Sequence, residues 1–227
     1  MGIDTDKSAG YFPFYGRLAN EQKTVLLSNL QKRRFNKGDI IHSGAEDCIG
    51  LLLVTEGQLR VYALSDEGKE LTLYRLFERD MCLFSASCIM ASIQFEVMIS
   101  AERDTQTLIV PALVYKQLMT DSAAVANYTN ELMASRFTEV MWLIDQIQNK
   151  KLDSRLAAFL IEESYLTSDN VLSITHEAIA NHLGSIREVI TRMLKYFQEE
   201  GLVKLGRGYI NLTDTVRLTD MAKNSLK

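Results

Sequence analysis

Two arginines and a glutamate in the C-terminal part of the chain have the types and the spacing that can read a base pair. Arg187, Glu188 and Arg192 fall on the polar face of a helix that is predicted to follow Gly184 and to run to Phe197. A guanidinium can donate two hydrogen bonds to O6 and N7 of guanine, and a carboxylate can accept one from N4 of the paired cytosine. The three side chains can therefore address G·C pairs in DNA; the alternative is an ordinary solvated surface.

The residues around this face predict two helices joined by a tight turn. Thr175 is the predicted N-cap of the first helix, and Gly184 supplies the left-handed residue at which that helix ends. Ser185 is the predicted cap of the second helix, in a capping box that Glu188 completes. The buried face of the second helix is expected to consist of Ile186, Val189, Ile190, Met193 and Phe197. Such an arrangement is a helix-turn-helix, which places its second helix in the major groove.

The segments on either side complete a small domain. The sequence GLVKLGRGYINLTD predicts two short strands that meet at residues 206–208 and form a wing. Lys204 and Arg207 of this wing would lie near passing phosphates. Asp153 is the predicted N-cap of a preceding helix over residues 154–164, and we place a domain boundary at about Lys150.

The first half of the chain has the pattern of an antiparallel β domain. Short alternating runs between Lys37 and Val110 are separated by turns that carry glycine and aspartate, which is typical of a sandwich or barrel. Residues 66–69 predict a hairpin turn, and residues 19–35 predict a short amphipathic helix. The fold class is therefore α+β.

Between the two parts, over residues 112–149, the sequence pattern becomes helical. Its apolar residues repeat at the spacing of a coiled-coil seam, and they are Met133, Phe137, Val140, Ile144 and Ile147. This stripe predicts pairing with a second copy of the chain. The alternative is that the stripe packs on its own domain.

Composition excludes several classes of protein. The chain has 227 residues, and 47% of them are apolar. Its formal net charge of −4 argues against a protein that coats nucleic acid with a generally basic surface. No apolar run approaches the ~20 residues of a membrane span, and the N-terminus does not have the pattern of a secretory signal. Three cysteines fit a reducing cytoplasm better than a disulfide framework. We therefore expect a cytoplasmic protein with no membrane partner.

Residues 174–195 have the arrangement I-T-H-E-x-I-A-x-x-L-G-x-x-R-E-x-x-x-R-x-L-K. This arrangement resembles the Crp/Fnr family of bacterial transcription regulators, and the resemblance extends to the EGQLRVY and DEGKE runs of the β region. It implies an N-terminal antiparallel β-roll (a jelly-roll of the cyclic-nucleotide-binding kind) as a sensor domain over residues 1–120. A long dimerisation helix over residues 121–149 and a C-terminal winged helix-turn-helix over residues 150–227 would follow.

The resemblance also implies a function and the residues that perform it. The protein would be a transcription regulator and not an enzyme: a homodimer that binds double-stranded DNA and works with RNA polymerase. Arg187, Glu188 and Arg192 would read bases in an inverted repeat with TGTGA-like half-sites. The expected phosphate contacts are Ser185, Thr191, Lys195, Lys204 and Arg207.

The sensor part lacks the residues by which two subgroups of this family detect their signals. Where the family's cyclic-nucleotide cassette has Gly-Glu and Arg-Ser pairs, this chain has Leu83-Phe84 and Phe95-Glu96. A buried phosphate needs a paired charge or several donors, so the sequence disfavours cAMP. The three cysteines, none of them in the first 47 residues, are too few for the four thiolates of an iron–sulfur cluster.

An apolar segment of the sensor part is the candidate effector pocket, with the members Phe84, Cys88, Ile89, Met90, Ile93 and Phe95. These residues fit an apolar or aromatic small molecule, or haem, for which His42 is the one histidine in this domain. The alternatives are plain core packing, a thiol switch between Cys82 and Cys88, and a constitutive regulator with a degenerate sensor. A cupin-type metal enzyme needs clustered ligands, and the sequence shows no such metal site.

Overall fold

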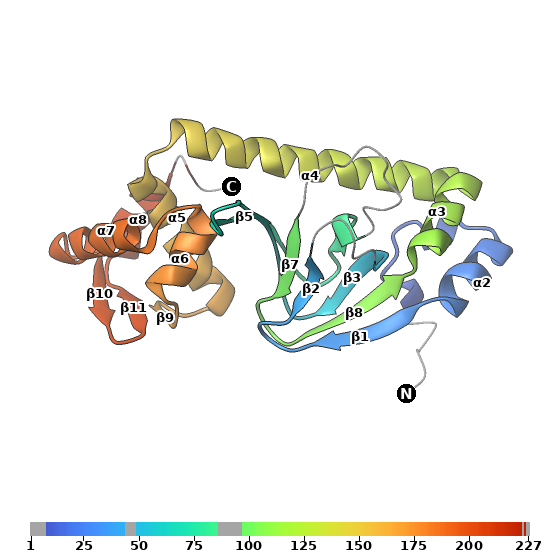
Figure 1. Ribbon diagram of the computed structural model, residues 1–227, viewed down its shortest axis with the longest axis horizontal. Helices are drawn as coiled ribbons and strands as arrows, with labels where there is room; N and C mark the ends of the chain where they lie inside the picture. The colour runs from blue at the N-terminus through green and yellow to red at the C-terminus, as the bar shows by residue number, and fades with distance from the viewer. Residues whose placement is uncertain (1–7, 44–48, 86–96, 224, 226–227) are drawn as a thin grey trace. The chain divides into compact units, whose positions relative to one another are not determined.

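The computed structural model describes residues 8–43, 49–85, 97–223 and 225 (Figure 1). The chain forms two compact units. One comprises Met1–Leu64 and Leu73–Val140, and the other comprises Ser65–Thr72 and Met141–Lys227. No helix among the described residues is long and apolar enough to cross a membrane.

The first unit is built around two four-stranded antiparallel sheets, with the strand orders β1-β8-β3-β6 and β2-β7-β4-β5. The strands are β1 Gln31–Phe35, β2 Ile40–Ser43, β3 Leu51–Glu56, β4 Leu59–Leu64, β5 Glu70–Leu76, β6 Met81–Cys82, β7 Met98–Ala101 and β8 Thr105–Val110. Both sheets contribute side chains to one apolar core, so they pack face to face. The β-roll and the α+β fold class that the sequence predicts are confirmed.

Strand β3 is buried on both of its faces. Leu52 and Val54 enter the core between the sheets, while Leu51 and Leu53 enter a second core, because successive side chains of a strand point to opposite faces. The second core is closed by helices, which are η1 Tyr15–Arg17, α2 Asn20–Ser28, α3 Ala112–Asp121 and the start of α4 Ala123–Asn149. The roll therefore has helices packed against one of its two sheets.

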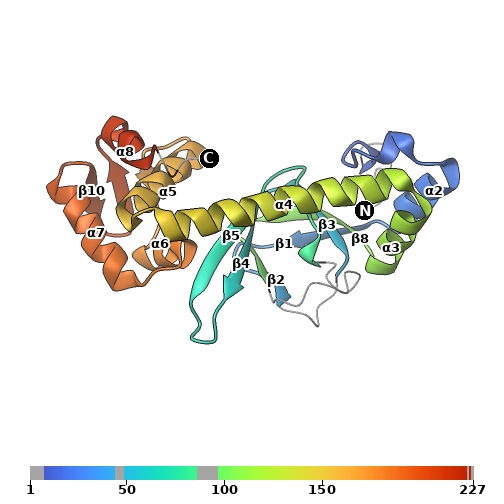
Figure 2. The same cartoon turned by 90° about the horizontal axis from the view of Figure 1, so that it is seen from above.

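One boundary in this unit differs from the sequence prediction. The helix expected over residues 19–35 is wrong beyond Ser28, because residues 31–35 pair with β8 as strand β1. The predicted hairpin turn at residues 66–69 is confirmed between β4 and β5 (Figure 2), where the Ser65 amide donates to the Lys69 carbonyl at 2.9 Å.

The second unit contains a winged helix-turn-helix. Its elements are α5 Leu152–Thr167, β9 Val171–Leu172, α6 His176–Leu183, α7 Arg187–Glu199, β10 Val203–Gly206, β11 Tyr209–Leu212 and α8 Thr215–Ala222. The wing hairpin gains β9 as a third strand, which the sequence analysis did not predict. Helix α5 begins at Leu152 with Lys151 at its N-cap, and Asp153 lies inside its first turn. The N-cap predicted at Asp153 is therefore wrong, because the backbone is already helical there.

Candidate nucleic-acid interface

A threonine and a glycine set the turn between α6 and α7. The Ala178 amide donates to Thr175 Oγ1 at 3.1 Å, which confirms Thr175 as the N-cap of α6. Gly184 ends α6 in the left-handed region, with φ of 63°. A Cβ at this position would lie 2.9 Å from Leu71 Cδ1. Both the backbone angle and this neighbour favour glycine at the turn.

Helix α7 begins without the predicted capping box. Its N-cap is Ile186, and no side chain caps the helix. Ser185 instead donates its backbone N–H to the Ala180 carbonyl at 2.9 Å, which closes the end of α6. The Ser185–Glu188 box is therefore wrong, and the Glu188 carboxylate is not engaged at the start of α7.

Helix α7 has one exposed polar face and one buried face. The exposed residues are Arg187, Glu188, Arg192 and Lys195, and among the described residues their side chains have no hydrogen-bond or ion-pair partner. The fully buried residues are Ile190, Leu194 and Phe197, each 0% exposed. The prediction was wrong for Ile186, which is 48% exposed because it precedes the first helical turn, and it missed Leu194. The structure thus places the three predicted base readers together on one open surface.

A histidine of α6 contacts this helix, and the sequence analysis did not single it out. His176 Nδ1 lies 2.9 Å from Thr191 Oγ1. The pKa of His176 is lowered, first by its partial burial and second by the positive charge of Arg187. Thr191, a predicted phosphate contact, is therefore oriented by a neutral imidazole near pH 7.

The wing lies beside the start of α6 and α7. Strands β10 and β11 pair so that Gly206 is opposite Tyr209, and Lys204 and Arg207 are exposed. A hollow of about 460 Å³ is bordered by the wing and by both helices, and its lining includes Thr175, His176, Arg187, Gly206 and Tyr209. Helix α7, His176 and the wing therefore border one concave surface.

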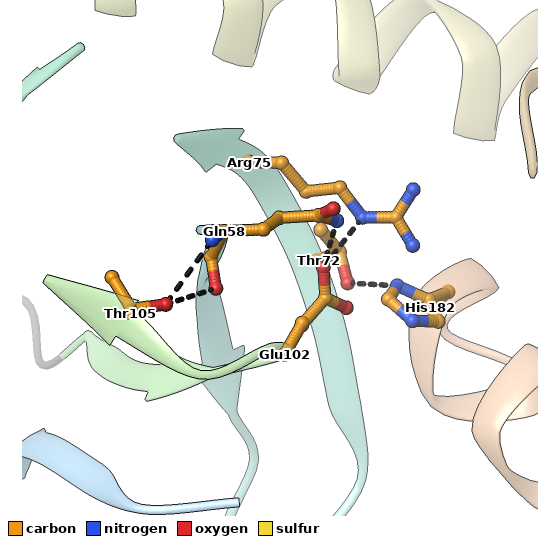
Figure 3. Close-up of polar contacts among 6 residues, drawn as sticks. All are labelled: Gln58, Thr72, Arg75, Glu102, Thr105 and His182. Carbon is orange, nitrogen blue, oxygen red and sulfur yellow. Dashed lines mark hydrogen bonds and ion pairs between the residues drawn. The ribbon is translucent and has the colours of Figure 1, made fainter. Parts of the chain in front are cut away.

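Two long-range hydrogen bonds hold the helix-turn-helix from other elements. Arg155 of α5 donates from Nη2 to the Leu183 carbonyl at 2.7 Å, at the end of α6. His182 Nδ1 lies 2.8 Å from Thr72 Oγ1 (Figure 3). These pairs are 28 and 110 residues apart in the chain, so no local pattern could have predicted them.

Known proteins share this fold and this helix pair. Residues 154–221 match the Crp-like helix-turn-helix domain. A solved structure from Eubacterium rectale, described as a transcriptional regulator of the Crp/Fnr family, is 62% identical in sequence and has a TM-score of 0.93. The match covers 94% of this chain and 99% of that one.

The chain belongs to the Crp/Fnr family. Its members are DNA-binding transcription regulators and not enzymes. More distant relatives include the cyclic AMP receptor protein of Thermus thermophilus, 26% identical over 92% of this chain and 96% of that protein. The global nitrogen regulator of Synechococcus elongatus is 23% identical over 84% of this chain and 89% of that protein.

Much of the effector pocket predicted for this Crp/Fnr regulator lies outside the described residues, namely Cys88, Ile89, Met90, Ile93 and Phe95. Phe84 is described and is buried, as is Cys82. His42 is 2% exposed, inside the roll. In the part of the chain that the structure describes, no three His, Cys, Asp or Glu side chains gather as metal ligands.

The predicted dimer seam of this Crp/Fnr regulator is unevenly exposed along α4. Phe137, Ile144 and Ile147 are 67%, 40% and 44% exposed, which is unusual for large apolar side chains. Met133 and Val140 are half-buried, and Met133 packs against the helical core of the roll. Most of the apolar stripe is therefore open to a partner.

Proposed function

We propose that this Crp/Fnr regulator binds an inverted repeat with TGTGA-like half-sites as a homodimer, with Arg187, Glu188 and Arg192 reading the bases. The observation that carries the proposal is the exposed polar face of α7, where Arg187, Glu188 and Arg192 have no hydrogen-bond or ion-pair partner among the described residues. An arginine is suited to guanine and a glutamate to the paired cytosine. Charged side chains that have no hydrogen-bond or ion-pair partner among the described residues are available for bases.

Phosphate contacts would come from the residues that surround this face. Lys195 lies farther along the exposed side of α7, and Lys204 and Arg207 project from the wing. Ser185 and Thr191 offer hydroxyl groups at the turn and on α7. Contacts of this kind set the register of a protein on DNA without carrying sequence information.

A dimer would bring two such reading helices to successive major grooves. The exposed residues Phe137, Ile144 and Ile147 give α4 an apolar stripe at coiled-coil spacing. A two-fold symmetric dimer matches an inverted repeat whose half-sites lie about one helical turn apart. We take residues 1–120 as the sensor domain, 121–149 as the dimer helix and 150–227 as the DNA-binding domain.

An effector in the β-roll would gate DNA binding by shifting the population of the dimer that is able to bind DNA.

The second candidate function is that of a constitutive regulator, which binds DNA without an effector. It is favoured by Leu83 and Phe84, which are 3% and 6% exposed and stand where the family's cyclic-nucleotide cassette has a glycine and a glutamate. RNA polymerase is the further partner that we expect from the family resemblance.

Fluorescence anisotropy with labelled duplexes tests the proposal. The full-length protein is titrated into an inverted repeat of TGTGA, into the same duplex with one half-site scrambled, and into a duplex with both scrambled. We expect the affinity for the inverted repeat to exceed that for the fully scrambled duplex by at least ~10³-fold at physiological salt. Equal affinity for the three duplexes would contradict the proposed site.

A further inference from the structure

An isoleucine is exposed at the start of the charged face of α7. Ile186 is 48% exposed, and it directly precedes Arg187 and Glu188, which are exposed as well. Other apolar residues anchor α7 in the core, among them Ile190 and Leu194, which are fully buried. Ile186 therefore presents apolar surface beside the residues to which we assign base reading.

The position that this isoleucine occupies favours other residue types. Ile186 is the N-cap of α7, where serine, threonine, asparagine and aspartate are strongly preferred and isoleucine is among the least favoured residues. A polar cap accepts a hydrogen bond from an amide of the first helical turn, and an isoleucine side chain has no atom that can do so. The residue thus gives up a cap and exposes apolar surface, so the stability of the helix does not explain its presence.

The backbone at Ile186 is held from both sides. Its carbonyl accepts hydrogen bonds from the Val189 amide at 3.0 Å and from the Ile190 amide at 3.2 Å. The preceding residue, Ser185, donates its amide to the Ala180 carbonyl at 2.9 Å. Because a β-branched side chain is also stiff at χ1, Ile186 is a positioned apolar group that loses little entropy when it contacts a ligand.

The major groove of DNA offers an apolar group to such a side chain. Thymine carries its C5 methyl group in this groove, and apolar side chains contact that methyl group. The N-terminal residues of a recognition helix are the ones that contact base edges. In the proposed TGTGA half-site a thymine precedes each guanine, so a methyl group lies next to every guanine that Arg187 would read.

We propose that Ile186 reads a thymine of the half-site through the C5 methyl group of that base. The inference rests on the DNA readout proposed above and adds an apolar contact to it. Arg187 and Glu188 recognise a G·C pair by hydrogen bonds, and Ile186 recognises the neighbouring T·A pair by covering its methyl group. Specificity at the start of α7 then combines polar and apolar contacts to successive base pairs.

Duplexes with deoxyuridine in place of thymidine test the contact, because the two nucleosides differ only in the C5 methyl group. Each thymine is replaced in turn, in both half-sites, and the affinity of the full-length protein is measured by anisotropy. We expect replacement at one position to lower the affinity about fourfold per half-site, as the burial of one methyl group implies. Unchanged affinity at every position, in a protein that prefers the repeat to a scrambled duplex, would overturn this inference alone. Equal affinity for the repeat and the scrambled duplex would contradict the proposed function and this inference together.

Substitutions of the isoleucine assign the methyl effect to this residue. Ile186→Val keeps a β-branched apolar side chain, so it should keep the loss of affinity on deoxyuridine replacement. Ile186→Ser removes the apolar contact, so the thymidine and deoxyuridine duplexes should bind it equally well. Val216→Ala is the control, because Val216 is 79% exposed on α8 and its truncation should leave the methyl effect as in the wild-type protein. A methyl effect of full size in Ile186→Ser would show that another residue contacts the thymine, contrary to the proposal.

The Tm of the DNA-free variants separates a reading role from a packing role. Serine is a favourable N-cap, so Ile186→Ser should have a Tm equal to or above that of the wild-type protein. A stable variant that has lost the methyl effect supports the proposal, since the loss then does not result from unfolding. A Tm clearly below that of the wild-type protein would show that Ile186 is retained for packing, and the assignment to DNA reading would be wrong.

Discussion

At the scale of single residues, the start of α7 excludes the capping role that the sequence predicts for Glu188. The sequence S-x-x-E predicts a capping box, yet Ile186 occupies the N-cap and Ser185 closes α6 through its backbone. Within the described part of the chain, the side chains of Glu188 and Arg187 make no hydrogen bond. Their charges therefore contribute little to folding and can contribute to DNA binding.

His176 should make the stability of the protein depend on pH. Its pKa is lowered in the folded state, so the unfolded chain binds this proton more readily. The stabilising contribution is complete above the unfolded value of about 6.5 and is lost as the pH falls below it. In urea titrations between pH 7.5 and pH 5.5, His176→Gln should lose less unfolding free energy than the wild-type protein. Equal losses in the two proteins would show that His176 does not titrate in this way.

The sequence analysis could predict single residues only where local rules decide. Thr175 and Gly184 follow from the rules for helix ends, and both are confirmed. The contacts of His176 with Thr191 and of Arg155 with Leu183 depend on how helices cross, so local rules did not find them. The base-reading roles stay predictions, because they concern DNA that the free protein does not contact.

At the scale of elements, the turn between α6 and α7 depends on one glycine. Gly184→Ala places a Cβ in a left-handed conformation and 2.9 Å from Leu71 Cδ1. We expect it to destabilise the protein by at least about 1–2 kcal/mol in urea unfolding. Gly16→Ala is the control, because a Cβ there meets nothing within 4 Å and the backbone is not left-handed. A Gly184→Ala variant as stable as Gly16→Ala would show that the turn tolerates a side chain.

The sequence pattern predicted the presence of helices and strands better than it predicted the residues at which they begin and end. The sequence pattern predicted the antiparallel β region, α7 and the two strands of the wing. It missed β9, a strand of two residues whose neighbour β11 lies nearly 40 residues later in the sequence. It also extended the first helix into β1, whose sequence QKRRF carries no strand alternation and is mostly exposed.

At the scale of the whole molecule, pairing through α4 should control DNA binding. Phe137→Glu places a charge on the most exposed apolar residue of the seam, and Thr138→Glu places the same charge on its exposed neighbour. By light scattering, we expect Phe137→Glu to be a monomer and Thr138→Glu to be a dimer. Phe137→Glu should also lose affinity for the inverted repeat. A dimeric Phe137→Glu protein would place the interface elsewhere.

The most direct test of the proposed DNA readout is a base-preference series for Arg187→Ala. Affinities are measured by anisotropy for the TGTGA repeat and for duplexes in which each G·C pair is changed in turn. Arg34→Ala is the control, because it removes the same charge from an exposed position on β1. We predict that Arg187→Ala costs about 1–3 kcal/mol of binding free energy and removes the preference at one G·C pair. Full affinity and an unchanged base preference in Arg187→Ala would contradict the account.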